Sequence, residues 1–325
     1  MAHKTVYSRR WNFKVTEATR ETICRILAWD LKQLEIGEWA FVDHDGKFHS
    51  VDSERDKLAG TRMPLRGAFC YWKGDMEAHM YSHFLEKTGR YFKCNSRCDW
   101  CLATSDKRSP ELSWGDLTLR ALWRWTLTME DSPSDPSPWK VVPRFEKSKR
   151  LLDLMHIVHL GTLRDIVASV LIDSLQDGSM GLFYGLQDHN DILRLFSKHA
   201  EAWARSHGMA LYMGKLTKAR LGRPSYDHWP YPILDSRVKA AKARTLLGFC
   251  THIMCLLACN APVQLQRHAQ LRATMCWTLD VALSTFNLNK CVIMSAPCVA
   301  EVTWLLRLHL ACYQRLSCES LQKMK

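Results

Sequence analysis

Apolar and polar positions follow two different patterns along this chain. Up to about residue 150, short apolar runs typical of strands are mixed with segments of helical spacing. From about residue 151 onward, the pattern is typical of helices almost throughout. We therefore expect a mixed α/β (α+β) region at residues 1–150 and a large, mostly α-helical region at residues 151–325.

The first region combines helices with several strands. Apolar residues at helical spacing predict a helix over residues 16–34, and Gly37 marks its end. Residues 39–51 predict a strand, an Asp-Gly turn and a second strand. A further strand is expected at residues 65–72, and helices are expected at 77–87 and 117–128. Proline and serine between residues 131 and 143 indicate a linker or surface loop.

The second region is expected to contain long helices. Their predicted ranges are 161–176, 188–206, 235–259, 263–285 and 297–322. The longest apolar run covers residues 246–258 and includes Thr251 and His252. It is too short for a comfortable bilayer crossing, so we interpret it as a buried helix and expect no membrane partner.

Composition and charge narrow the class of protein. The chain has 325 residues, of which 47% are hydrophobic, so it can bury a substantial core. Its net charge of +12 favours acidic partners, of which DNA and RNA are the commonest, although many basic proteins bind neither. It has 13 cysteines and no apolar stretch at its start. We expect a nuclear or cytoplasmic protein whose thiols are free or metal-bound.

Three clustered cysteines are the first candidate chemical site. Cys98 and Cys101 have the two-residue spacing that lets two thiolates bind one tetrahedral zinc ion, and Cys94 is a candidate third ligand. The alternatives are three unrelated cysteines or a redox motif, although no thioredoxin-like context surrounds this one. We expect one structural zinc, with any remaining ligand supplied from elsewhere in the chain.

Acidic residues and a histidine form the other candidates. Asp75 directly follows the predicted strand that ends FCYWKG, where a carboxylate is well placed to hold a divalent metal. Asp153 and His156 would share one face of a helix, and His156 could bind zinc or a phosphate. The simpler interpretations are a solvated turn carboxylate for Asp75, a helix cap for Asp153 and a packed ring for His156.

The order of these motifs resembles a known family. GDME, FKCNSRCDWC and DLMHIVHLGTLRDIVASVL together resemble the middle of a transposase-like family abundant in dinoflagellate genomes, similar to CACTA-type DDE transposases. The resemblance covers roughly residues 39–175 and implies an RNase H-like core. In that family a catalytic acid is followed by a Cys-x-x-Cys and then a Cys/Asp-x-x-His motif. Asp75 would match the second catalytic acid, and Asp153 with His156 would match the last motif.

The chain also departs from that family. The first catalytic acid should lie well upstream of Asp75, and only the hairpin residues Asp43 and Asp45 are nearby. The last acid should follow the helical region, where Glu301 and Glu319 are poor matches. We therefore expect an incomplete core, an internal piece of a transposase. Because one carboxylate cannot hold two metal ions, Asp75 would be a catalytic remnant, and Mg or Mn would bind only if catalysis survived.

Basic clusters keep DNA binding possible without catalysis, because counterion release needs only grouped cations. The cations of the first cluster, and two at the start of a predicted helix, are candidate phosphate contacts: Lys140, Arg144, Lys147, Lys149, Arg150, Lys239 and Lys242. Further cations lie in a glycine-containing loop: Lys215, Lys218, Arg220 and Arg223. The alternative for each cluster is an ordinary solvated surface.

Three functions are compatible with these patterns. The one we favour is a degenerate, transposase-derived protein without catalysis that retains affinity for DNA. The second is an active metal-dependent transposase or nuclease whose missing acids come from unexpected positions. The third is a zinc-stabilised structural or interaction protein.

Overall fold

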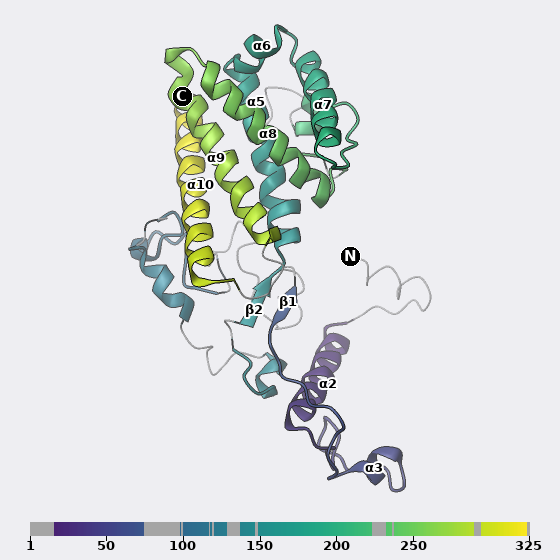
Figure 1. The fold of residues 1–325 in the computed structure, drawn as a ribbon. Coiled ribbons are helices and arrows are strands. Elements are labelled where there is room, and N and C mark those ends of the chain that lie inside the picture. The colour runs from purple at the N-terminus through teal and green to yellow at the C-terminus, as the bar shows by residue number, and fades with distance from the viewer. Residues whose placement is uncertain are drawn as a thin grey trace. The chain divides into compact units, whose positions relative to one another are not determined.

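The computed structural model divides into two compact units, Met1–Asp153 and Leu154–Lys325, and each is described by itself (Figure 1). It describes residues 16–74, 98, 100–116, 118, 120–128, 137–146, 149–222, 232–235, 237–288 and 294–323.

The expected α/β architecture with an RNase H-like core is wrong. The described residues are 64% helical and 4% strand, and their one sheet has two parallel strands. These are β1 (Trp72–Gly74) and β2 (Arg150–Leu152), with Lys73 opposite Leu151. Of the strand predicted at 65–72, only Trp72 lies in a strand, and residues 65–71 belong to no helix or strand. The hairpin predicted at 39–51 is reduced to one bridge between Val42 and Phe48.

The predicted hairpin does not extend into a sheet because its apolar side chains remain largely exposed. Phe41 is 61% exposed and Phe48 is 82% exposed. A two-stranded ribbon is marginal in water unless a third strand or a helix buries one of its faces. The alternating pattern therefore correctly located a turn, with Gly46 at φ 77°, but it did not predict a β core.

Helix α2 (Glu17–Ile36) confirms the helix predicted at 16–34. The Thr16 hydroxyl accepts a hydrogen bond from the Thr19 N–H, and Gly37 ends the helix in the left-handed conformation at φ 79°. The other helical elements of this unit are short: α3 (Glu54–Leu58), η1 (Pro110–Leu112), η2 (Leu122–Thr128) and η3 (Pro138–Val141).

The segment predicted as a linker contributes to the core of this unit instead. The side chain of Trp139, on η3, is completely buried and packs with Cys24 and Ala28 of α2. Its ring lies 4.1 Å from that of Trp72, measured between centroids. A proline- and serine-rich composition predicts irregular backbone, and the backbone is irregular here, but composition does not exclude one large buried anchor.

The second unit is built from long helices. Its elements are the π-helical η5 (Met155–Thr162), α5 (Leu163–Gln176), α6 (Ser179–Tyr184), α7 (His189–Ser206), η6 (Lys218–Leu221), α8 (Ala240–Asn260), α9 (Val263–Leu288) and α10 (Ala296–Lys323). All five long helices predicted in this region are confirmed. The start of α8 is the largest difference, five residues later than the predicted residue 235.

Helix α9 lies between α8 and α10, and α5 also packs against α8 (Figure 1). The core between these helices contains completely buried aliphatic and aromatic side chains such as Leu171, Phe196 and Leu246. Their recurrence every three or four residues brings them to one face of each helix, so one continuous core forms.

Among the described residues, two helical segments are long and apolar enough to cross a membrane. They are Met155–Gln176 and Ala240–Asn260, whose most apolar windows are 39% and 50% buried within the protein. Length and composition alone do not distinguish a membrane span from the core helix of a soluble protein.

Replacing Trp139 by alanine should destabilise the first unit by about 3–5 kcal/mol, because removal of a large buried ring leaves a cavity against α2. Hydrogen–deuterium exchange of the α2 amides should speed up. Trp125→Ala is the matched control, since this ring is 73% exposed, and it should change exchange little. Equal effects of the two substitutions would contradict the assigned core.

Candidate functional site

Asp75, Cys94 and Lys147 lie outside the described residues. Cys98 is half-buried and Cys101 is buried. The Trp100 N–H donates to the Cys98 sulfur at 3.3 Å, and the Trp100 indole donates to the Arg150 carbonyl at 3.0 Å. The turn with the two cysteines is thereby tied to β2, but no third metal ligand joins them within the described part of the chain.

Asp153 and His156 do not share a helix face, contrary to the prediction. Asp153 directly follows β2, and its carboxylate lies 3.9 Å from the Lys73 ammonium on β1. His156 is exposed on η5, in the other unit. The residues are close in sequence, but a strand ends before the first and a helix begins before the second, so helical spacing does not apply.

The predicted phosphate contacts differ in accessibility. Arg150 is only 3% exposed, so it cannot serve as a surface contact. Arg144 is exposed and forms an ion pair with Glu35 at 3.2 Å. Lys140 is exposed and Lys149 is partly buried. Lys239 is exposed before α8, and Lys242 is partly buried on its first turn.

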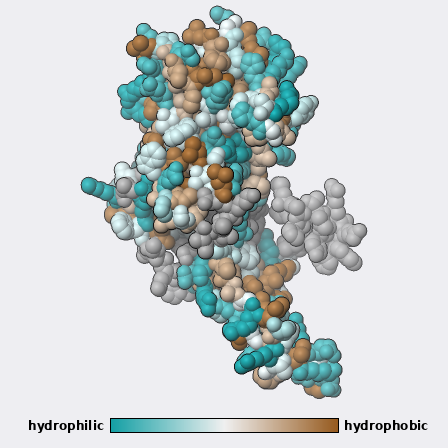
Figure 2. All heavy atoms as spheres, viewed as in Figure 1, coloured by the Kyte–Doolittle hydropathy of each residue, from teal (hydrophilic) through white to brown (hydrophobic). Residues whose placement is uncertain are grey.

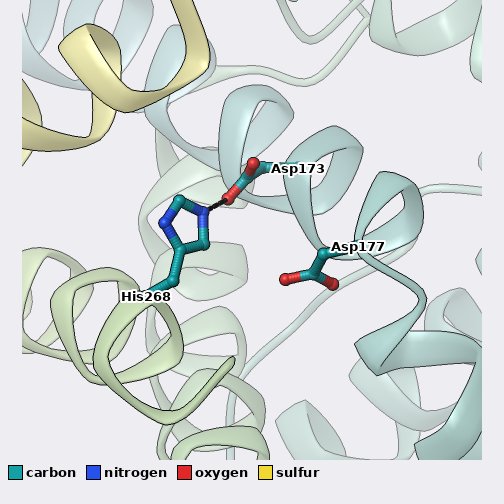
Figure 3. Close-up of side chains that lie close together, drawn as sticks. All are labelled: Asp173, Asp177 and His268. Atoms are coloured by element: carbon teal, nitrogen blue, oxygen red, sulfur yellow. Dashed lines mark hydrogen bonds and ion pairs between the residues drawn. The ribbon is translucent and has the colours of Figure 1, made fainter. Parts of the chain in front are cut away.

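The strongest concentration of titratable groups lies elsewhere, inside the second unit. Asp173 on α5, Asp177 at its end and His268 on α9 have side chains that meet (Figure 3). One potential ligand atom from each residue lies within 4.8 Å of the others. His268 Nε2 is 2.7 Å from Asp173 Oδ2 (Figure 3). This is the only group of three such ligands among the residues that the structure describes.

A guanidinium already occupies the space between the two aspartates. Arg272 is 1% exposed and follows His268 by one turn of α9. Its Nη1 lies 3.2 Å from Asp173 Oδ2, and its Nη2 lies 2.6 Å from Asp177 Oδ2. Nη2 also donates to the Ser179 hydroxyl at 3.2 Å. A divalent cation bound here would meet a fixed positive charge, so the arrangement fits an ion-pair network better than a metal site.

The second ring nitrogen of His268 extends the network to α10. Its Nδ1 lies 2.9 Å from Glu319 Oε2, and Glu319 Oε1 accepts from Arg315 Nε at 2.8 Å. Because ionised carboxylates only accept hydrogen bonds, the two contacts of the ring require an imidazolium. Asp173, Asp177 and Glu319 then balance Arg272, Arg315 and His268, and the network carries no net charge.

The pKa values follow from these contacts. The hydrogen bond to Asp173 raises the pKa of His268, burial opposes this change, and the hydrogen bond to Glu319 adds to it. The hydrogen bond from His268 lowers the pKa of Glu319, against a smaller effect of burial, and Arg315 lowers it further. Both shifts favour the charged forms, as the geometry requires.

His309 on α10 has the opposite environment, although it also faces α9. It is 3% exposed, and its Nδ1 lies 2.8 Å from the Met275 carbonyl oxygen. A carbonyl cannot donate, so Nδ1 carries the proton. Burial lowers the pKa of this imidazole, against a smaller opposing effect of the hydrogen bond. The interface between α9 and α10 therefore contains one charged and one neutral histidine.

No protein-family model, curated protein or solved structure matches this chain significantly.

The contacts within this network limit its chemistry. Each carboxylate of the network is held by a cation, and the histidine is held on both sides. The imidazolium has no lone pair with which to act as a general base, and the cations paired with the carboxylates make them weaker bases. The chemistry of the network is structural, because it joins α5, α9 and α10 through charge. The sequence pattern did not reveal this network because His268 lies 95 residues from Asp173 and 51 residues from Glu319. Only the pairs Asp173/Asp177 and His268/Arg272 have the i, i+4 spacing that a local pattern can show.

Replacing Arg272 by methionine should cost about 3–5 kcal/mol of unfolding free energy, because it removes a buried cation from two partly buried carboxylates, and Asp177 loses its ion pair. Arg315→Met is the control at a 55% exposed side chain, and it should cost at most about 1 kcal/mol. Urea denaturation followed by circular dichroism measures both. In addition, Mg²⁺, which carboxylates bind and thiolates do not, should not raise the melting temperature of the wild type. Stabilisation of the wild type by Mg²⁺ would contradict an ion-pair network.

His268 and His309 should make opposite contributions to the pH dependence of the free energy of unfolding. Since His268 has a raised folded pKa, its contribution is complete below the unfolded pKa of about 6.5 and is lost as pH rises through the folded value. His309 has a lowered folded pKa, so stability falls as pH drops below about 6.5. In urea denaturation across this range, His268→Gln should flatten the alkaline side and His309→Gln the acidic side. The reverse assignment would refute the protonation states.

Proposed function

We propose that this protein is a non-catalytic module that binds the phosphate backbone of DNA or RNA through one basic surface of its second unit. We call this surface the α7 basic surface. It consists of Arg194, Lys198 and Arg205 on α7 and of Lys215 and Lys218 in the segment that follows.

The first part of the surface is the outer face of α7. Arg194, Lys198 and Arg205 are exposed and are separated by four and seven residues, which brings them onto one face. The opposite face is apolar and completely buried at positions such as Leu193 and Phe196. Core packing thus fixes the rotation of the helix and directs the three cations to solvent.

The second part is the segment that runs back along α7. The Met213 N–H donates to Glu201 Oε1 at 3.1 Å, the Leu216 N–H to Ser197 Oγ at 3.1 Å, and the Lys218 N–H to Asn190 Oδ1 at 3.2 Å. Residues that come later in this segment contact residues that come earlier in α7, so the segment and the helix run antiparallel. Residues 190, 197 and 201 neighbour the basic stripe on the helix. Lys215, which is exposed, and Lys218 are therefore held beside it.

Acids do not neutralise this surface fully. Asp191 forms an exposed pair with Arg194 at 3.0 Å, which is weak in water, and one Glu201 oxygen is used by Met213. Many other acids of the unit contact internal cations, among them Asp173, Asp177, Asp280 and Glu319. By contrast, Lys198, Arg205 and Lys215 form no ion pair with any described residue. Figure 2 shows mainly hydrophilic side chains over α7.

This surface carries the proposal because its cations are grouped, exposed and anchored to a rigid helix. Phosphate backbones are recognised by such groups through counterion release, without a catalytic residue. Descent from a CACTA-like transposase stays a proposal that rests on the sequence motifs alone. Structural zinc at Cys98 and Cys101 likewise rests on their spacing alone.

Salt-dependent binding tests the proposal. The full chain should bind a short DNA duplex with an affinity that falls as salt rises, and Lys198→Gln/Lys215→Gln should reduce the logarithmic salt slope by about 0.9 for each phosphate that the variant no longer neutralises. Arg267→Gln/Arg307→Gln removes the same charge elsewhere in the unit and should leave affinity much closer to wild type. Fluorescence anisotropy measures both. An affinity that does not depend on salt concentration, or an equal loss of affinity in the two variants, would refute the α7 basic surface.

A further inference from the structure

The segment beside α7 carries an aromatic ring that the phosphate contacts do not use. Tyr212 is 76% exposed, whereas its neighbours Leu211 and Met213 are 7% and 6% exposed. This segment is neither helix nor strand, and exposure alternates from residue to residue between 211 and 213. Burial of both neighbours therefore directs the tyrosine ring outward.

The backbone that carries this ring is held by hydrogen bonds on the side of Met213. The Met213 N–H, in the peptide bond after Tyr212, donates to Glu201 of α7 at 3.1 Å. The Met213 carbonyl oxygen accepts from Arg220 Nη1 at 2.7 Å. Arg220 is held in turn by the Lys215 carbonyl at 2.8 Å and by Asp235 at 3.5 Å. Because this backbone is already constrained, little backbone conformational entropy is lost when the exposed side chain binds a ligand.

The ring lies within the α7 basic surface. The contact between Met213 and Glu201 places it beside the helix between the turns of Lys198 and Arg205, and Lys215 follows three residues later. A flat apolar ring among backbone-binding cations is the combination that recognises unpaired bases, because every base offers a face for stacking. In a duplex the bases are already stacked on one another and are not available.

We infer that the α7 basic surface prefers single-stranded nucleic acid and that Tyr212 stacks on an unpaired base. This inference rests on the function proposed above and adds the form of the ligand. The cations would follow the phosphates of the strand, and the tyrosine would supply affinity that a duplex cannot use.

Affinities for oligo(dT) and for a DNA duplex of equal length, measured by fluorescence anisotropy on the full chain, test this inference. Tyr212→Ala should weaken binding to oligo(dT) by about 5- to 150-fold, the range for loss of one stacked base, and should change duplex binding little. Tyr212→Phe keeps the ring and should retain wild-type affinity. Trp304→Ala removes another exposed ring, 56% accessible on α10, and should change neither affinity.

The outcomes separate the inference from the function on which it rests. If duplex binding depends on salt and on Lys198 and Lys215 but Tyr212→Ala changes nothing, the preference for single strands is refuted and the basic surface stands. If Tyr212→Ala lowers the affinities for oligo(dT) and for the duplex equally, stacking of Tyr212 on an unpaired base is refuted. If neither ligand binds, the function and the inference fail together.

Discussion

The helical unit depends on one constraint, the partly buried ion network of Asp173, Asp177, His268, Arg272, Glu319 and Arg315. Apolar packing alone tolerates small rotations and shifts between helices, because dispersion and burial have little directional preference. A guanidinium held by two carboxylates, and an imidazolium held on both ring nitrogens, tolerate far less. The network therefore fixes α5, α9 and α10 relative to one another, within a core that is otherwise mostly apolar.

This internal arrangement also determines the surface. Acids that would otherwise face solvent are used inside the unit or at helix ends, as Asp188 is used to cap α7. Cations without such partners remain outside, so a basic sequence becomes a basic face rather than an evenly mixed surface. The amphipathic packing of α7 and the antiparallel segment after it concentrate these cations in one place. The proposed binding function thus follows from where the acids are located as much as from the number of lysines and arginines.

The first unit is organised on a different principle. Its core is small and centres on the Trp139 ring, which packs against α2 and against Trp72 of a two-stranded sheet. Aromatic side chains bury large areas for few residues. This suits a unit whose described residues contain one long helix and mostly irregular backbone. Because this small core does not bury the apolar side chains around Phe48, the segment there does not form a sheet.

The sequence by itself determined the long helices, their approximate ends, the turn at Gly46 and the excess of positive charge. These features depend on residues close in the chain: apolar spacing, caps and turn residues act over a few positions, so local pattern is sufficient. Only the tertiary structure decided that the extended runs would not form an α/β core, that Asp153 and His156 would belong to different elements, and that Trp139 would be buried. It also brought His268 to Asp173 and Glu319 across long stretches of chain. Such contacts depend on which faces of helices far apart in sequence pack together, and a pattern over a few neighbouring residues does not predict that packing.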